Sequence, residues 1–433
     1  MKKDVNEYRG VDTRPEVDVG AWGGISLHNL RIFNSLKNPV YRLYFAGVLG
    51  QRASMNMQMM ARSLLIYRLT GSPAILGMMS LFHALPMLFL SLFGGVIADR
   101  VQKKYVLLNG LASSAVVSLG VALTLTLGYL SVERTGSWWI LAVASLLQGT
   151  IMGLMIPSRH AIVPEIVDKE QFMNAISLDT LGMNALRLFA PALAGFLIDA
   201  FDFQAVYYAM TGMYLIGVVF IAFMPLTSTM TLRGSDALND IKEGLSYIRQ
   251  ETTIFLILVF TLFAVVLSMP YIMLMPIFAD DILKVGATGM GVLLSVSGIG
   301  AIIGSLTLAS LPNKKRGLIL LASGLLLGLA LASFSFSSLW PLSLVLISFV
   351  GLGQAGRMTL GNTLIQYYAD DNYRGRVMSI HIMEIGLTSF STFSAGLIAE
   401  AIGAQWALGG FATVLVLLCL LALVFVPRLR KLD

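Results

Sequence analysis

Apolar segments alternate with short polar segments along nearly the whole chain. After a polar stretch at residues 1–43, each apolar segment has roughly the 20 residues that a helix needs to cross the hydrocarbon core of a bilayer. Helices are expected because backbone polar groups cannot stay unpaired in lipid. The predicted spans are residues 44–67, 73–97, 105–129, 137–159, 174–199, 205–225, 253–275, 287–311, 317–337, 340–366, 377–401 and 405–427. The pattern therefore predicts an all-α polytopic membrane protein with twelve transmembrane helices.

The longest internal polar segment, residues 226–252, separates six predicted spans from the other six. We therefore expect two six-helix halves, at 44–225 and 253–427, between a cytoplasmic N-terminal segment at 1–43 and a tail at 428–433. A shift of 202 residues supports a duplication. It aligns Gly149 with Gly351, Asp168 with Asp370 and Ser177 with Ser379. Parallel repeats of this kind occur in some transporters.

The linker between the halves has the pattern of an amphipathic helix. Its apolar side chains at helical spacing are Ala237, Ile241, Leu245 and Ile248, with charged residues between them. Ser235 or Asp236 would cap the helix. We expect it to lie along the cytoplasmic membrane face. The alternative is a helical tether with no further role.

Composition and charge exclude a soluble protein and disfavour a nucleic-acid partner. Of the 433 residues, 56% are hydrophobic and 12% are charged, and the net charge is +6. The basic residues alternate by connection: one set of connections carries 23 lysines and arginines, and the other carries only Arg68, Arg134 and Lys284. By the positive-inside rule the first set is cytoplasmic. We expect a multi-pass, monomeric protein of the cytoplasmic (inner or plasma) membrane, with both termini in the cytoplasm.

The connection between the second and third spans, FGGVIADRVQKKYVL, resembles the loop signature of the major facilitator superfamily. The matching residues are Gly95, Ala98, Asp99, Arg100, Lys103 and Lys104. A glycine at 95 permits close helix packing, and Asp99 can accept hydrogen bonds from a helix N-terminus or pair with an arginine. The resemblance implies that the loop latches the two halves in one state of a transport cycle. The alternative is a basic topology anchor.

Four further stretches are similar to the branch of that superfamily that includes the enterobactin exporter and the macrolide-efflux proteins. They are PSRHAIVPEIVDKEQFMNAISL, APALAGFLIDAFD, EGLSYIRQ and DDNYRGRVMSI. The resemblance covers residues 36–428 and implies the major facilitator fold and alternating access. The resemblance favours export and leaves the substrate open. We expect a proton-coupled exporter of a small amphiphilic or partly anionic molecule, a siderophore or a drug. The alternative is a lysophospholipid or lipid transporter of the same fold.

We expect no enzymatic activity, no metal and no cofactor. The sequence shows neither a nucleophile with a base nor a metal-ligating constellation, and it lacks a phosphate-binding loop of the Walker type. The single cysteine, Cys419, excludes an intrachain disulfide. The partners that we expect are a small-molecule substrate, the lipid bilayer and protons.

Six charged residues remain well inside predicted spans: Arg52, Arg62, Arg187, Arg357, Asp179 and Glu384. A charge at the bilayer centre costs about 2.5–3.5 kcal/mol on insertion scales, so these side chains are expected to face the protein interior. The four arginines exceed the two carboxylates, which favours a substrate with negative character. His83 and His381 could sense protons, but we interpret them as ordinary hydrogen-bonding residues.

The first span carries polar side chains along one side of the helix. On a helical wheel, Gln51, Gln58 and Arg62 form one ridge, and Arg52, Asn56 and Ser63 form a second ridge about 120° away, with Met55 and Met59 between them. In the superfamily, helices 1, 4, 7 and 10 line a central cavity. The resemblance therefore implies these substrate-cavity residues: Arg52, Asn56, Gln58, Met59, Arg62 and Arg357.

Depth in the membrane suggests an ion-pair cluster between the halves. Arg52, Arg357 and Glu384 lie about 10–14 Å from the cytoplasmic ends of their helices, at 1.5 Å per residue. We hypothesise that Glu384 pairs with Arg52 or Arg357 in one state, and that protonation or substrate binding releases it. The alternative is a permanent structural pair. Arg187 is expected to pair with Asp179 or to cap carbonyl groups within its own half.

Overall fold

The computed structural model describes residues 31–134, 136–226, 237–312, 314–370 and 373–432. Over these ranges the chain forms helices joined by turns, and it contains no strand. The predicted helix caps Ser235 and Asp236 lie outside the described residues. The all-α fold class predicted from the sequence is confirmed.

The first bundle contains a short 3-10 helix, η2, and five α-helices. They are η2 (Arg31–Lys37), α1 (Pro39–Thr70), α2 (Pro73–Arg100), α3 (Lys103–Thr126), α4 (Trp139–Ile166) and α5 (Lys169–Ala222). Within the bundle α1 packs on α5, α2 packs on α4, and α3 packs on both α4 and α5. Helix α5 bends at Asp202, whose φ of 69° and ψ of 173° are non-helical, and this divides it into two arms.

The ends of α1 follow from local sequence. The Asn38 side-chain oxygen accepts hydrogen bonds from the backbone N–H groups of Val40 and Tyr41, and Pro39 occupies the first helical position. Both features are favoured at a helix start. The helix ends at Gly71, whose φ of 61° suits glycine. The observed helix is therefore several residues longer than the predicted span 44–67.

The second bundle holds the helices that follow α6. They are α7 (Thr252–Ser268), α8 (Pro270–Ile277), the π-helix η3 (Phe278–Ile282), α9 (Gly286–Ser310), α10 (Arg316–Ser335), α11 (Trp340–Tyr368), α12 (Arg374–Ile402), α13 (Ala404–Phe425) and the short α14 (Pro427–Arg430). Helix α11 packs on α9 and α10, and α13 packs on α10 and α12. The predicted span 253–275 corresponds to α7 and α8, which are separated at Pro270 because proline lacks an N–H donor.

Ten helices of the described chain are long and apolar enough to cross a membrane. Helix α5 is counted once among them, although Asp202 divides it into two arms. Helix α1, which carries Arg52 and Arg62, is not among the ten. The predicted number of twelve therefore depends on treating the two arms of α5 and the polar helix α1 as separate spans.

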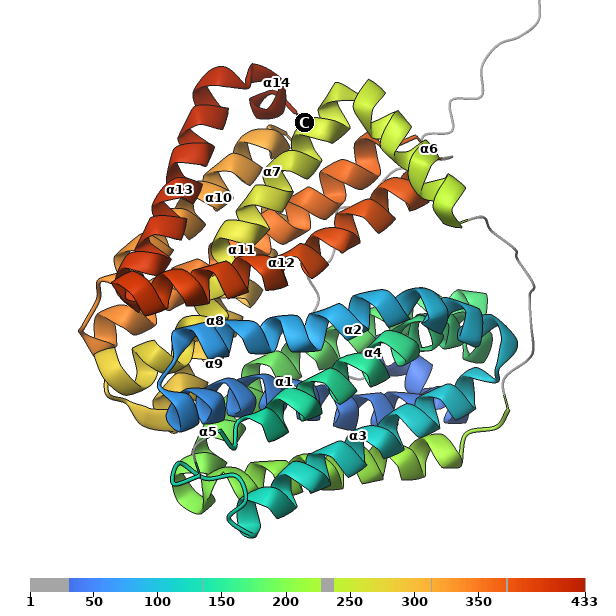
Figure 1. The fold of residues 1–433 in the computed structure, drawn as a ribbon. Helices are drawn as coiled ribbons and strands as arrows, with labels where there is room; N and C mark the ends of the chain where they lie inside the picture. The colour runs from blue at the N-terminus through green and yellow to red at the C-terminus, as the bar shows by residue number, and fades with distance from the viewer. Residues whose placement is uncertain (1–30, 135, 227–236, 313, 371–372, 433) are drawn as a thin grey trace, which may run out of the picture.

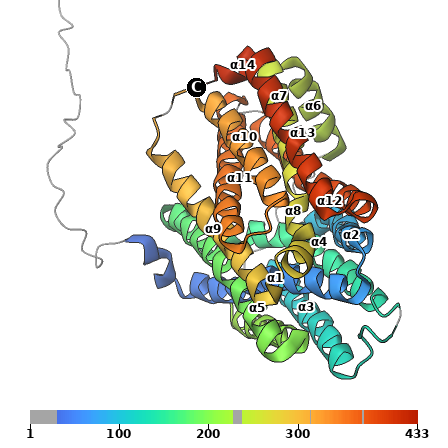
Figure 2. The same ribbon diagram turned by 90° about the vertical axis from the view of Figure 1, so that its left-hand side faces the viewer.

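The two bundles contact each other along two seams, α5 against α9 and α2 against α12. Both views place these helices side by side, and in Figure 1 the bundles converge at the left and diverge toward α6 (Figure 1, Figure 2). Glycines bring the backbones together. A Cβ on Gly195 would lie 2.3 Å from the Ala287 carbonyl oxygen, and one on Gly396 would lie 2.5 Å from that of Pro73. Small residues permit this close approach in membrane bundles.

The predicted linker helix is observed as α6 (Ala237–Gln250), and it is docked on the second bundle. The Tyr247 ring stacks on the Tyr373 ring at 4.4 Å and 5°, and Glu243 pairs with Arg376 at 2.7 Å. Ile248 is buried, whereas Leu245 is exposed. The other two residues of the predicted apolar face are Ala237 and Ile241, and their side chains lie outside the described part of the structure.

Candidate functional site

The polar side of α1 divides between the bundle interior and accessible surface. Gln51 is 1% exposed, and its amide nitrogen lies 3.6 Å from the Met155 sulfur on α4, so the predicted ridge position of Gln51 belongs to the bundle core. Asn56 and Gln58 are partly exposed, and Met59 is 40% exposed. These three side chains are accessible as predicted, and their place in a substrate cavity stays a prediction.

Arg52 forms a bidentate ion pair with Asp179 inside the first bundle. Its two terminal nitrogens lie 2.6 and 2.7 Å from the two carboxylate oxygens of Asp179, and one also donates to the Asp179 backbone carbonyl at 2.9 Å. Two parallel charge-assisted hydrogen bonds are the strong form of this interaction. In this conformation Arg52 therefore does not pair with Glu384. The reason is that α1 packs directly on α5, which carries Asp179.

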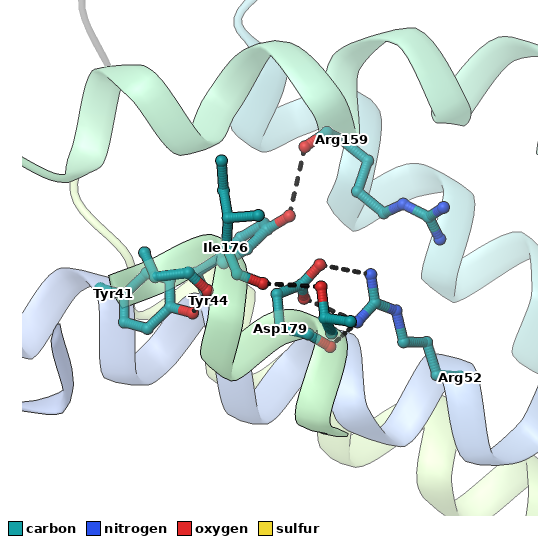
Figure 3. A network of polar contacts seen from close by, with 8 residues as sticks. Tyr41, Tyr44, Arg52, Arg159, Ile176 and Asp179 are labelled. Atoms are coloured by element: carbon teal, nitrogen blue, oxygen red, sulfur yellow. Dashed lines mark hydrogen bonds and ion pairs between the residues drawn. The ribbon is translucent and has the colours of Figure 1, made fainter. Parts of the chain in front are cut away.

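A cavity of about 250 Å³ lies beside this ion pair, between α1, α4 and α5. Its lining residues are Tyr44, Arg52, Arg159, His160, Val163, Phe172, Ile176 and Asp179. Figure 3 shows the guanidinium groups of Arg159 and Arg52 turned toward the same space. The Tyr44 hydroxyl donates to the Arg159 carbonyl at 3.2 Å, and the Tyr41 hydroxyl donates to the Ala175 carbonyl at 2.8 Å. Two tyrosines of α1 thus tie α4 and α5 together around the cavity.

The sequence reasoning missed Arg159 because it placed this residue at the end of a span and counted it with the loop charges. Helix α4 continues to Ile166, about two turns further, so Arg159 is a residue of the helix. The signal was present in the sequence. Ile162 and Ile166 continue the apolar periodicity past Arg159, and both are buried.

In the second bundle Glu384 has two close polar neighbours. Its Oε1 accepts a hydrogen bond from the Thr261 hydroxyl of α7 at 3.0 Å, and Nδ1 of His381 lies 3.1 Å from the same oxygen. Arg357 of α11 is 5% exposed and lies within electrostatic range of Glu384, but it forms no ion pair with any residue that the structure describes. Glu384 thus contacts His381, which we had interpreted as an ordinary hydrogen-bonding residue, and neither of the arginines that we expected.

The two remaining arginines lie apart from Asp179. Arg62 donates to the Ser145 hydroxyl of α4 at 3.3 Å. Arg187 lines a second cavity, of about 270 Å³, where α5 meets α9 and α11, together with Gln354 and Met358. Within the described chain Arg187 forms no ion pair, so the expected pairing of Arg187 with Asp179 is not found. Arg52 occupies both carboxylate oxygens instead.

The motif between α2 and α3 makes its described contacts within the first bundle. Lys103 pairs with Glu165 at 2.6 Å, and Lys104 donates to the Ala222 carbonyl at 2.8 Å. A Cβ on Gly95 would meet no atom of the described side chains and backbone within 4 Å, so the close packing that we expected at Gly95 is found at its neighbour Gly94. Arg100 is exposed. The side chains of Ala98 and Asp99 lie outside the described part, and the latch stays a prediction.

Contacts between the bundles at their converging end involve four carboxylates that sequence reasoning did not select. Arg68 pairs with Asp280 at 2.8 Å, and the Tyr67 hydroxyl donates to Asp281. The other two are Glu400, which accepts from the Ser72 hydroxyl at 2.7 Å and the Ala74 N–H at 3.0 Å, and Asp199, which accepts from the Thr288 N–H at 2.7 Å.

The contacts of Glu400 and Asp199 are reciprocal. Glu400 at the end of α12 caps the N-terminus of α2, and Asp199 on α5 caps the N-terminus of α9. Each carboxylate comes from one bundle and each helix N-terminus from the other. Carboxylates are stabilising at helix N-termini, where backbone N–H groups lack partners. We call these two contacts the reciprocal caps.

Comparison with known proteins gives a family match over almost the whole described chain. A family model described as "Transmembrane secretion effector" matches residues 31–433. The staphyloferrin A transporter of Staphylococcus aureus is 24% identical over 332 residues, which cover 76% of this chain and 81% of that protein. The macrolide efflux protein A of Streptococcus pyogenes is 25% identical, over 93% of this chain and 99% of that protein. The enterobactin exporter of Shigella boydii is 26% identical, over 76% of each.

Solved structures show the same fold at low sequence identity. The nucleoside transporter NupG has a TM-score of 0.69 and 13% identity, over 88% of this chain and 99% of that one. A bacterial homologue of the human lysosomal transporter Spinster, described as inward-facing and unoccupied, has a TM-score of 0.67 and 12% identity, over 94% and 98%. The predicted major facilitator fold and the resemblance to exporters are thereby confirmed.

Proposed function

This chain belongs to the transmembrane secretion effector family of the major facilitator superfamily, and on that premise we propose that it exports a small amphiphilic or partly anionic molecule by alternating access. Membership makes it an integral membrane transporter. Siderophore and macrolide transport by its relatives supports the choice of substrate class. The proposed protein is a monomer in the cytoplasmic membrane, with both termini in the cytoplasm.

The observation that carries alternating access is the convergence of the two bundles toward one end. The Glu400 cap joins the end of α12 to the start of α2, and the Asp199 cap joins α5 to the start of α9. The Arg68–Asp280 pair joins the end of α1 to η3. The bundles diverge toward α6 and the basic connections (Figure 1). The positive-inside rule assigns that diverging end to the cytoplasm. The conformation is then inward-facing, and rocking of the bundles would expose the other side.

Transport in proteoliposomes tests the proposal. The purified full-length protein would be reconstituted with an imposed pH gradient and offered an iron siderophore, a macrolide and a fluorescent lysophospholipid. We expect gradient-driven movement of the siderophore or the macrolide. Failure of all three probes, in protein whose folding is verified by its thermal unfolding, would refute the proposal.

For proton coupling we propose Glu384 as the residue that is protonated and released. A buried carboxylate inside a membrane helix is a natural proton carrier, because its protonation removes a costly charge. Two neighbours support this choice: the Thr261 hydroxyl, which donates to the carboxylate at 3.0 Å, and Nδ1 of His381, which lies 3.1 Å from it. We expect Glu384→Gln to abolish accumulation driven by a pH gradient while retaining substrate exchange at equal pH. Glu133→Gln, at an exposed turn, is the matched control. Unchanged gradient-driven accumulation in Glu384→Gln would exclude this role.

The second cavity favours lipid or lysophospholipid transport as a second candidate function. It lies at the seam between the bundles and combines Arg187 with the exposed apolar side chains of Ile302, Leu306 and Met358. A cationic group beside apolar surface suits a phosphate headgroup with its acyl chain. If this candidate is right, Arg187→Gln should slow movement of the fluorescent lysophospholipid and leave macrolide transport intact. If Arg187→Gln moved the lysophospholipid and the macrolide at the wild-type rates, this candidate would be excluded.

A further inference from the structure

The cavity between α1, α4 and α5 holds more positive than negative charge. We propose that it binds the single anionic group, carboxylate or phosphate, of the transported molecule, with Arg159 as its primary contact and Asp179 as a displaceable internal substitute. This inference rests on the proposed export function and adds the binding site and the charge of the cargo.

The charge balance of the cavity favours binding of an anion. Asp179 neutralises Arg52 through two hydrogen bonds of 2.6 and 2.7 Å. Arg159 lines the same cavity, and its guanidinium makes no hydrogen bond or ion pair with any residue in the described ranges. Arg159 is partly exposed and lies beside the Arg52–Asp179 pair, so two guanidinium groups share one carboxylate, and one positive charge has no counter-ion among the described residues. One anionic group from outside would complete the set.

The size and walls of the cavity indicate which part of the cargo enters it. Its volume of about 250 Å³ is below the 300–1,000 Å³ typical of sites that enclose a whole drug-sized ligand. Val163, Phe172 and Ile176 supply apolar walls around the charged groups, and exposed His160 adds an imidazole. The cavity therefore suits the charged end of an amphiphile, with the rest of the molecule outside it.

The local scaffold presents Arg159 without occupying its side chain. The Tyr44 hydroxyl contacts the backbone carbonyl of Arg159, which leaves the guanidinium available (Figure 3). Arginine offers a planar fork of donors that matches a carboxylate or a phosphate. An entering anion binds Arg159 first and then competes with Asp179 for Arg52. Release of Asp179 would loosen the contact between α1 and α5, which links binding to movement within the bundle.

If the cargo competes with Asp179, loss of charge at Arg159 and loss of charge at Asp179 should change the binding affinity in opposite directions. Removing the charge of Arg159 should weaken binding of an anionic probe, whereas removing the charge of Asp179 should strengthen it. A merely structural role for these residues predicts weaker or unchanged binding in both cases. Arg159→Gln is a mild perturbation because it breaks no ion pair of the described structure, and Arg159→Lys keeps the charge but removes the fork.

The experiment measures binding to the full-length protein in nanodiscs by fluorescence. The probe is 6-(dansylamino)hexanoate, and its neutral amide is the matched control. We expect Arg159→Gln to weaken binding of the carboxylate about tenfold, Arg159→Lys to weaken it less, and Asp179→Asn to tighten it severalfold. Binding of the amide should be the same in all variants. Thermal unfolding of each variant identifies any that fail to fold.

Two outcomes would overturn the site. One is an Arg159→Gln variant that binds the carboxylate as the wild type does or loses both probes equally. The other is a folded Asp179→Asn variant that binds the carboxylate more weakly. Competition by lysophosphatidate vesicles against competition by free acetate distinguishes a lipid phosphate from a soluble carboxylate as the natural source.

Transport of both probes, measured in parallel in proteoliposomes, separates this inference from the proposed function. Movement of the amide without binding of the carboxylate would retain export and reject the site. Binding with the expected pattern but no transport of any probe would retain the site and reject export.

Discussion

Loss of the charge of Glu400 should shift the protein toward the state that is open at the converging end. Glu400→Gln keeps an acceptor oxygen for the Ser72 hydroxyl and the Ala74 N–H but removes the negative charge at the N-terminus of α2. A carboxylate at a helix N-terminus contributes about 0.3–1 kcal/mol, and up to about 2 kcal/mol when partly buried. We take about 1 kcal/mol, which is about fivefold in an equilibrium constant.

The whole of this energy acts on the conformational equilibrium because the contact joins the two bundles. The same estimate holds for Asp199→Asn at the N-terminus of α9. The two caps lie on separate seams, so their effects should add to about 2 kcal/mol, or roughly 30-fold. The Arg68–Asp280 pair remains in the double variant and keeps part of the contact.

Distances between spin labels at Val132 and Leu339 would measure this equilibrium. Both positions are exposed turns, one in each bundle, and the buried Cys419 is replaced by serine to remove background labelling. The open-to-closed ratio should rise about fivefold in each single variant and about 30-fold in the double variant. Glu133→Gln is the control for loss of a carboxylate elsewhere. Unchanged open-to-closed ratios in both single variants would refute the conclusion that the reciprocal caps hold the converging end closed.

Three further predictions concern packing. Gly195→Val should force α5 and α9 apart, because even its Cβ would lie 2.3 Å from a backbone oxygen. Gly410→Val is the control, because a Cβ there meets no described atom within 4 Å. The same spin-label distances should change in Gly195→Val and stay unchanged in Gly410→Val. Tyr247→Ala should release α6 from α12 by removing the ring stacked at 4.4 Å, and faster trypsin cleavage after Arg249 would reveal it. Gln51→Leu should leave the substrate range unchanged, because this side chain is 1% exposed and packs on a methionine. The unfolding midpoint should shift by only a few degrees, and a changed substrate range would show that Gln51 contacts the substrate.

Much of the fold could be predicted from local sequence. The length of each apolar run and the need to pair backbone groups in lipid dictate membrane-spanning helices. Several ends also follow from local chemistry, such as the Asn38 cap and the turn at Gly71 of α1. The sequence predicts two spans at 174–199 and 205–225, and the non-helical residue Asp202 falls in the interval between them.

The partners of the charged side chains were decided by tertiary packing alone. Helical periodicity predicts the direction in which Arg52 points from its own helix axis, but it does not predict which helix lies in that direction. Arg52 and Asp179 meet across 127 residues of sequence because α1 packs on α5. Likewise, Glu384 meets Thr261 because α12 packs on α7. The sequence by itself determined that these charges face protein rather than lipid, since lipid cannot solvate them. Only the packing of the helices decided which charges neutralise each other. The same packing left Arg159 without a counter-ion among the described residues.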